Sequence, residues 1–141
     1  MALKIDLKPH EKIIVGSCII TNTDQRTKIL IEGDTLPVLR EKDILTPATA
    51  DTPSKLIYLA IQLMYICDHP QDQHVIYFDL IRELLHVMPS AAPIVSNIND
   101  HILSGDYYKA LKESKKLIAG ERRLLDSARG TAAASGLPTA A

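Results

Sequence analysis

The hydrophobic pattern of this chain changes from a period of two to a helical period across one short segment, residues 46–53. The segment holds three threonines and two prolines, a composition that resists both helix and strand and is typical of a joint. Apolar residues alternate with polar ones before it and recur every three or four positions after it. The pattern predicts an α+β protein: a small N-terminal antiparallel β subdomain, or partial barrel, followed by a bundle of about four helices.

The β subdomain is expected over residues 1–45. Turn-forming Pro, Gly, Asn and Asp residues separate short runs that are rich in Ile, Val and Leu. The expected strands cover residues 3–7, 12–21 and 28–32, with a short edge segment at 37–40.

A linker at residues 46–52 precedes the helical subdomain, which is expected over residues 53–126. Thr52 suits an N-cap, Pro53 suits the first turn, and Gly105 followed by Asp106 is typical of one helix ending and another beginning. The expected helices run from residue 53 to before Pro70, over 73–88, over 92–103, and from residue 106 onward. Residues 127–141 offer little to bury and are expected to form a disordered tail.

The first two helices carry more apolar surface than one small sheet can cover. The first has a single polar stripe, formed by Lys55, Tyr58, Gln62 and Tyr65. Either these helices pack against each other and the sheet, or part of their apolar surface closes a homodimer. We expect Tyr58, Gln62 and Tyr65 to form a partner interface, although tyrosines at this spacing can also cover a core.

The N-terminus and the two cysteines indicate a cytoplasmic protein. The first residues lack the layout of a signal peptide, and the longest apolar stretch, residues 56–67, is shorter than the roughly 20 residues of a membrane span. Cys18 and Cys67 are interpreted as small buried apolar residues because disulfides are rare in that compartment.

Catalytic and metal-binding motifs are missing from the sequence. It has no Gly-rich phosphate loop, nucleophile elbow, His-Glu-x-x-His or paired-cysteine site, so we expect no enzyme and no cofactor. Cys67, His69 and His74 come close together in sequence, but a polar turn between helices explains them without a metal.

The net charge of −1 is unevenly distributed. Residues 1–45 are balanced, with seven basic and seven acidic residues, whereas residues 46–105 carry two basic and six acidic ones. Residues 106–141 carry seven basic and four acidic residues. Any nucleic-acid footprint must therefore be local.

Five segments together resemble the FlbT family of flagellum biosynthesis repressors over residues 3–125. They are the opening Leu-Lys-Ile-Asp-Leu-Lys-Pro-His-Glu-Lys (3–12), Val-Leu-Arg-Glu-Lys-Asp-Ile (38–44), and the helical segments 57–58, 62–65 and 106–112. His10 departs from the family pattern, where glycine is expected in the first turn, and it would be modestly strained if that turn needs a positive φ. The resemblance implies a regulator that binds the 5′ untranslated region of flagellin mRNA and lowers its translation and stability.

The β region is also similar, more weakly, to the CsrA family of RNA regulators, in which an arginine beside the first strand contacts RNA. Arg40 would match that arginine, and Lys4 would then be its neighbour on one surface. The expected RNA-binding residues are Lys4, Lys8, Lys12, Arg26, Arg40 and Lys42. Solvated charges that protect an edge strand from aggregation are the alternative.

A second basic face is expected on the last helix, at Lys109, Lys112, Lys116 and Arg123, where an ordinary solvated surface is the alternative. A rival interpretation makes the protein an interaction module that acts through flagellin or the companion regulator FlaF. It is favoured by the absence of aromatic residues before Tyr58, because stacking on aromatic rings dominates recognition of single-stranded RNA.

Overall fold

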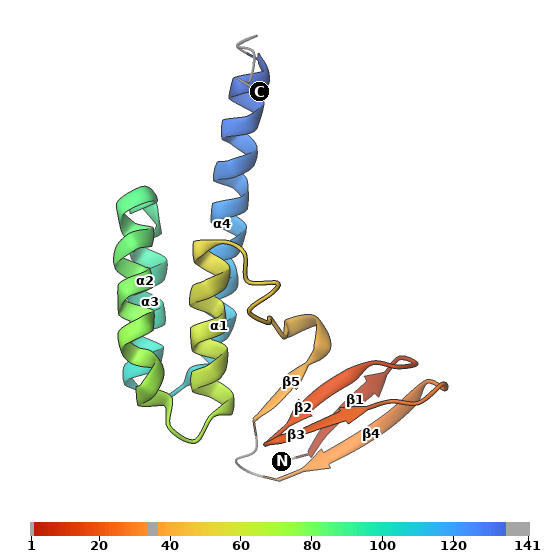
Figure 1. Cartoon of the computed structure of the whole chain (residues 1–141). Coiled ribbons are helices and arrows are strands. Elements are labelled where there is room, and N and C mark those ends of the chain that lie inside the picture. Colours follow the sequence, from red (N-terminus) through yellow and green to blue (C-terminus); the bar gives the residue numbers. More distant parts are fainter. Residues whose placement is uncertain (1, 34–36, 135–141) are drawn as a thin grey trace.

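A computed structural model describes residues 2–33 and 37–134, with side chains placed through residue 129. Five strands are followed by four α-helices, with short 3-10 turns between some of them (Figure 1). The expected α+β class is confirmed. No helix in the described part of the chain has the length and apolar character needed to cross a bilayer.

The strands form two small antiparallel sheets. Strand β1 (Ala2–Leu7) pairs with β4 (Thr27–Glu32), while β2 (Lys12–Val15) lies between β3 (Cys18–Thr21) and β5 (Val38–Arg40). The prediction of one strand over residues 12–21 was wrong, because Gly16, at a φ of 61°, turns the chain back on itself. Only glycine adopts that conformation without steric cost, so it ends β2 and allows the hairpin.

The three-stranded sheet separates two apolar cores. Ile5, Leu7 and Ile13 are buried between the two sheets. On the other face of the three-stranded sheet, Ile14 and Leu39 pack against the helices. Because successive side chains of a strand point to opposite faces, β2 and β5 contribute to both cores and tie the subdomains together.

The first turn has a positive φ at residue 10, which is the condition under which histidine is expected to be strained there. His10 has a φ of 63°, and its backbone N–H donates to the carbonyl of Thr23 at 2.9 Å. The side-chain amide of Asn22 donates to the carbonyls of Leu7, Lys8 and Gln25, at 3.2, 2.9 and 2.8 Å. These bonds hold the turn in shape around a residue that is mildly strained.

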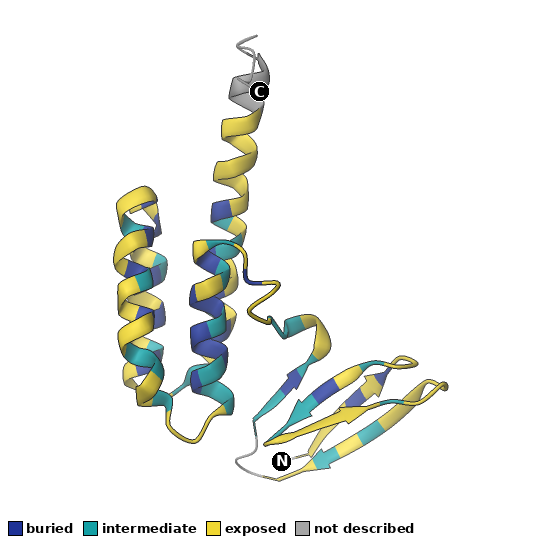
Figure 2. Ribbon diagram, in the orientation of Figure 1, coloured by how far each residue is buried: buried dark blue, intermediate teal, exposed yellow. Residues whose placement is uncertain are grey.

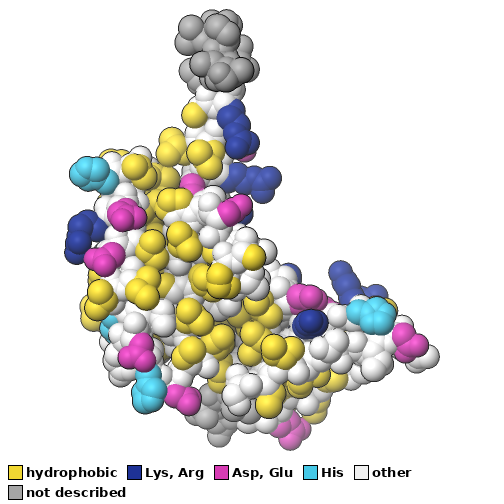
Figure 3. All heavy atoms as spheres, viewed as in Figure 1, with side chains coloured by type: hydrophobic (Ala, Val, Ile, Leu, Met, Phe, Trp, Pro, Cys, Tyr) yellow, Lys and Arg dark blue, Asp and Glu magenta, His cyan; other side chains and the backbone are white. Residues whose placement is uncertain are grey.

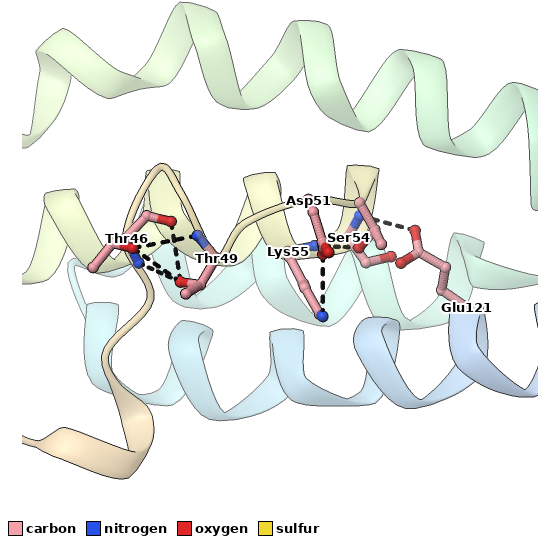
Figure 4. A network of polar contacts seen from close by, with 7 residues as sticks. Thr46, Thr49, Asp51, Ser54, Lys55 and Glu121 are labelled. Carbon is pink, nitrogen blue, oxygen red and sulfur yellow. Dashed lines mark hydrogen bonds and ion pairs between the residues drawn. The ribbon is translucent and has the colours of Figure 1, made fainter.

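The helices begin close to the expected positions. They are α1 (Pro53–Ile66), α2 (His74–Val87), α3 (Ala92–Leu103) and α4 (Tyr107–Ala134). The predicted caps are confirmed: Thr52 Oγ1 accepts from the Lys55 N–H at 3.3 Å, and Asp106 Oδ1 accepts from the Lys109 N–H at 3.2 Å. The linker is ordered by Thr46 and Thr49, whose hydroxyls lie 3.1 Å apart (Figure 4).

The helical core is built where α4 lies against α1 and α3, and α4 continues past both of them (Figure 2). The backbone is helical through Ala134, so the expectation of a disordered tail from residue 127 was wrong for residues 127–134. Residues 135–141 lie outside the described residues.

The prediction that both cysteines are buried was also wrong. Cys18 begins β3, whose four residues are all exposed, and Cys67 follows the last turn of α1. Both sit where an element starts or ends, so neither reaches a core. Among the described residues, no three His, Cys, Asp or Glu side chains are grouped so that they could hold a metal ion.

Candidate nucleic-acid interface

A cleft runs between the β1–β4 sheet and the helices, centred on the ring of Tyr108. One end, about 270 Å³, is lined by residues that include Leu3, Arg40, Lys42 and Asp43. The other end, about 310 Å³, is lined by residues that include Ile31, Val38 and Tyr65. Leu3, Val38 and Tyr108 line both ends, so the two hollows adjoin, and we call them together the Tyr108 cleft.

Tyr108 presents an aromatic ring in this cleft on a rigid support. Its side chain is 43% exposed, and its ring centroid lies 5.6 Å from that of Tyr65, with an interplanar angle of 44°. The Tyr65 hydroxyl accepts from the Val38 N–H at 3.0 Å and donates to the Val38 carbonyl at 3.2 Å. Because both hydrogen bonds hold Tyr65 against the backbone of β5, Tyr108 packs against a fixed ring while much of its own ring stays exposed.

One cation contacts the exposed ring and two more line the cleft. Lys112 Nζ lies 5.0 Å from the Tyr108 ring centroid, within the range of a cation–π contact. Arg40 and Lys42 line the cleft on the β5 side, and the one carboxylate on that side, Asp43, is paired with Lys115 at 2.6 Å. The β5 side of the cleft is therefore positive although the whole chain carries a net charge of −1, whereas Glu32 lines the other end.

Tyr58, Gln62 and Tyr65 form an internal seam rather than the expected partner interface. The Tyr58 hydroxyl donates to the Asp43 carbonyl at 2.6 Å. The Gln62 amide accepts from the Leu45 N–H at 2.8 Å and donates to the Leu45 carbonyl at 2.9 Å. Tyr58 and Gln62 are only 2% and 3% exposed, so the polar stripe of α1 satisfies the backbone of the chain between β5 and the linker.

Burial has an electrostatic consequence in this seam. It raises the pKa of Tyr58 above its usual 10.0, and the nearby Asp43 carboxylate raises it further. Burial also raises the pKa of Tyr65, although the hydrogen bond from Val38 opposes the change. Both hydroxyls therefore stay protonated near neutral pH and keep the donor bonds that join helix to strand.

The structure brings only some of the expected RNA-binding lysines and arginines together. Arg40 lies opposite Ile13 and shares its face of the sheet, whereas Lys4 alternates with buried Ile5 and points away from that core. Lys4 lines a separate hollow on the outer face of the β1–β4 sheet, where Arg26 pairs with Asp6 at 3.1 Å. Lys4 and Arg40 are therefore not neighbours on one surface.

Lys8 and Lys12 lie in surroundings of mixed charge. A hollow of about 330 Å³ is lined by residues that include Lys8, Lys42, Glu11 and Glu41. Glu11 accepts from the Lys8 N–H at 2.9 Å, and Glu41 accepts from the Lys12 N–H at 3.1 Å. These carboxylates weaken the attraction of the hollow for phosphate, so Lys42 is the member of this group best placed for the cleft.

The second basic face of α4 is exposed, as its helical spacing indicated. Lys109 pairs with Asp106 at 3.5 Å and Lys116 pairs with Glu113 at 3.1 Å, both within one turn of the helix. The Lys116 hydrogen bond lowers the pKa of Glu113. Arg123 lies further along the helix, so only Lys112 of this set joins the cleft.

Tyr108 was not identified as a site residue from sequence. Tyr108 itself contributed only to the family resemblance, because nothing local shows that this ring meets β5. The available signal was the spacing of Tyr108 and Lys112, four residues apart, which places a ring and a cation side by side on a helix.

Comparisons with known proteins agree with the sequence resemblance. The profile of a family described as "Flagellar protein FlbT" matches residues 3–125. "Probable flagellum biosynthesis repressor protein FlbT 1" of Bradyrhizobium diazoefficiens is 60% identical over 124 residues, which are 88% of this chain and 85% of that protein. No solved structure matches.

Two more distant relatives extend the match. "Probable flagellum biosynthesis repressor protein FlbT" of Rhodopseudomonas palustris is 47% identical, covering 89% of this chain and 98% of that protein. "Flagellum biosynthesis repressor protein FlbT" of Caulobacter vibrioides is 33% identical, covering 86% and 87%. This chain therefore belongs to the FlbT family.

Proposed function

We propose that this protein represses flagellum biosynthesis in the cytoplasm by binding the 5′ untranslated region of flagellin mRNA, which lowers translation and promotes degradation of the message. It turns over no substrate. The names of its relatives support the repressor role. The Tyr108 cleft is the observation that supports direct RNA binding.

The cleft combines the two features that single-stranded RNA binding needs. The open ring of Tyr108 offers a stacking surface, and a stacked base typically contributes about 1–3 kcal/mol. Arg40 and Lys42 line the cleft and Lys112 lies over that ring, and these cations suit the phosphates on either side of a stacked base. The aromatic residue that the β subdomain lacks is thus supplied by α4.

A titration of purified protein with the flagellin mRNA leader and a scrambled RNA, at two salt concentrations, tests the proposal. Tyr108→Ala should weaken leader binding by about 5- to 150-fold if one base stacks on the ring. Tyr108→Phe keeps the ring and should bind nearly as well as wild type. An equal loss in both variants would contradict stacking.

Charge reversal at Arg40 and Lys42 tests the phosphate contacts. The double variant should lower the slope of log affinity against log salt by about 1.4, because each lost phosphate contact contributes about 0.7 for a single strand. Lys4→Glu, on the opposite face of β1, is the matched control and should leave that slope nearly unchanged. No leader-selective binding at either salt, with or without FlaF, would instead favour the mechanism that acts through flagellin or FlaF.

A further inference from the structure

The end of α4 projects beyond the helices that support its first half. The Ser54 N–H donates to Glu121 at 3.0 Å, so α1 begins at the level of Glu121 (Figure 4). The Asn97 side-chain amide donates to Glu113 at 3.3 Å, so antiparallel α3, which starts at Ala92, begins near the same level. Residues 122–129, which we call the projecting segment, lie past that level and are all exposed (Figure 2). At about 1.5 Å per residue they add about 12 Å of unsupported helix.

The projecting segment continues the apolar stripe that packs the rest of α4. Three residues are buried on one side of the helix: Leu111, Leu117 and Glu121, which accepts the Ser54 N–H in the first turn of α1. Leu124 and Leu125 follow on the same side, seven residues after Leu117 and Ile118, yet they are 50% and 45% exposed. The pattern that builds the helix–helix interface thus runs on without a helix to cover it.

One edge of this stripe is basic. Lys115, Arg122 and Arg129 are seven residues apart, so they line the same edge of α4. Lys115, on this edge, pairs with an acidic group elsewhere in the chain: its ammonium lies 2.6 Å from the Asp43 carboxylate. Arg122 and Arg129 repeat the arrangement beside Leu124 and Leu125. In Figure 3 basic side chains lie along one side of the projecting end of α4 and apolar ones along the other.

We propose that the projecting segment is a docking site for an amphipathic helix of another protein, whose apolar face covers Leu124 and Leu125 and whose acidic edge pairs with Arg122 and Arg129. The partner helix packs against the projecting segment in the way that α1 and α3 pack against the first half of α4. Its carboxylates lie about seven residues apart, to match the spacing of the two arginines.

The charge pattern argues against a second copy of this chain as the occupant. In an antiparallel pair the arginine edges of both copies would face each other and repel. In a parallel pair Arg122 and Arg129 would face the other edge, at Gly120 and Ser127, which offers no carboxylate. Asp126, four residues after Arg122 and three before Arg129, lies beside both arginines but further from the apolar stripe than they do, so it does not face the second copy.

Two fluorescent synthetic helical peptides test the site on the full-length protein, measured by anisotropy. Each has a leucine stripe, one with glutamates and the other with lysines along the stripe edges. Wild type should prefer the glutamate peptide at least tenfold, and Arg122→Glu/Arg129→Glu should reverse that preference. Arg123→Glu is the matched control, because Arg123 lies opposite the stripe in the same segment, and it should keep the wild-type preference.

Leu124→Ser/Leu125→Ser should abolish binding of both peptides. Absence of binding by wild type at millimolar peptide, equal affinity for the two peptides, or an unchanged preference after charge reversal would overturn the proposal. A loss of leader RNA affinity in Arg122→Glu/Arg129→Glu without a change in peptide preference would also overturn it and assign the segment to RNA. The proposal does not depend on the Tyr108 cleft, whose variants are scored separately with RNA.

Discussion

Gln62 provides the most direct test of how the two subdomains are joined. Its side chain is 3% exposed and satisfies both backbone groups of Leu45, at 2.8 and 2.9 Å. Replacing it with leucine keeps the volume but leaves one N–H and one C=O of Leu45 without partners. An unsatisfied buried polar group costs about 1–3 kcal/mol, so Gln62→Leu should lower the free energy of unfolding by about 2–4 kcal/mol after the gain from apolar burial.

Urea denaturation followed by circular dichroism measures this loss, and the midpoint should fall with little change in slope. For a chain of this size the thermal midpoint should fall by about 6–14 °C. Gln71→Leu, at an exposed position between α1 and α2, is the control and should change stability by less than about 0.5 kcal/mol. A loss below about 1 kcal/mol in Gln62→Leu, or one equal to that of Gln71→Leu, would refute the account of the seam.

Three further predictions concern the turn, the buried tyrosines and the cysteines. His10→Gly should change stability by less than about 0.5 kcal/mol, because relief of the positive φ offsets the larger entropy that glycine loses on folding. His10→Val should cost about 1–2 kcal/mol. Equal urea midpoints for the two variants would contradict this expectation. Burial raises the pKa of Tyr58 and of Tyr77 above the usual 10.0. The stability gained by burying these neutral phenols is therefore fully present below pH 10 and declines as the pH rises above it. A pH series of unfolding free energies should show this decline, and the decline should be weaker in Tyr77→Phe. Cys18 and Cys67 should both react with a water-soluble thiol reagent in the native protein, and a thiol that reacts only after denaturation would contradict its exposure.

The sequence by itself determined the features that depend on neighbours along the chain. Strand alternation, the Thr52 and Asp106 caps and the helical periods all follow from spacings of a few residues, and the structure confirms them. Local reasoning failed at Gly16, where runs of Ile and Val on both sides of a two-residue turn have the pattern of one strand. It failed again for residues 127–134, where helix continues despite a sequence with little to bury.

Only the tertiary structure decided which surfaces face each other. A period of two shows that Lys4 and Ile5 lie on opposite faces of β1, but sheet pairing places Arg40 on the side of Ile5. A helical period shows a polar stripe on α1, but its packing against β5 turns that stripe inward to bind backbone. The same packing brings Tyr108 to β5 from far along the chain. Spacing fixes the face on which a side chain lies, whereas its neighbours across the cleft depend on contacts between distant segments, which no local pattern encodes.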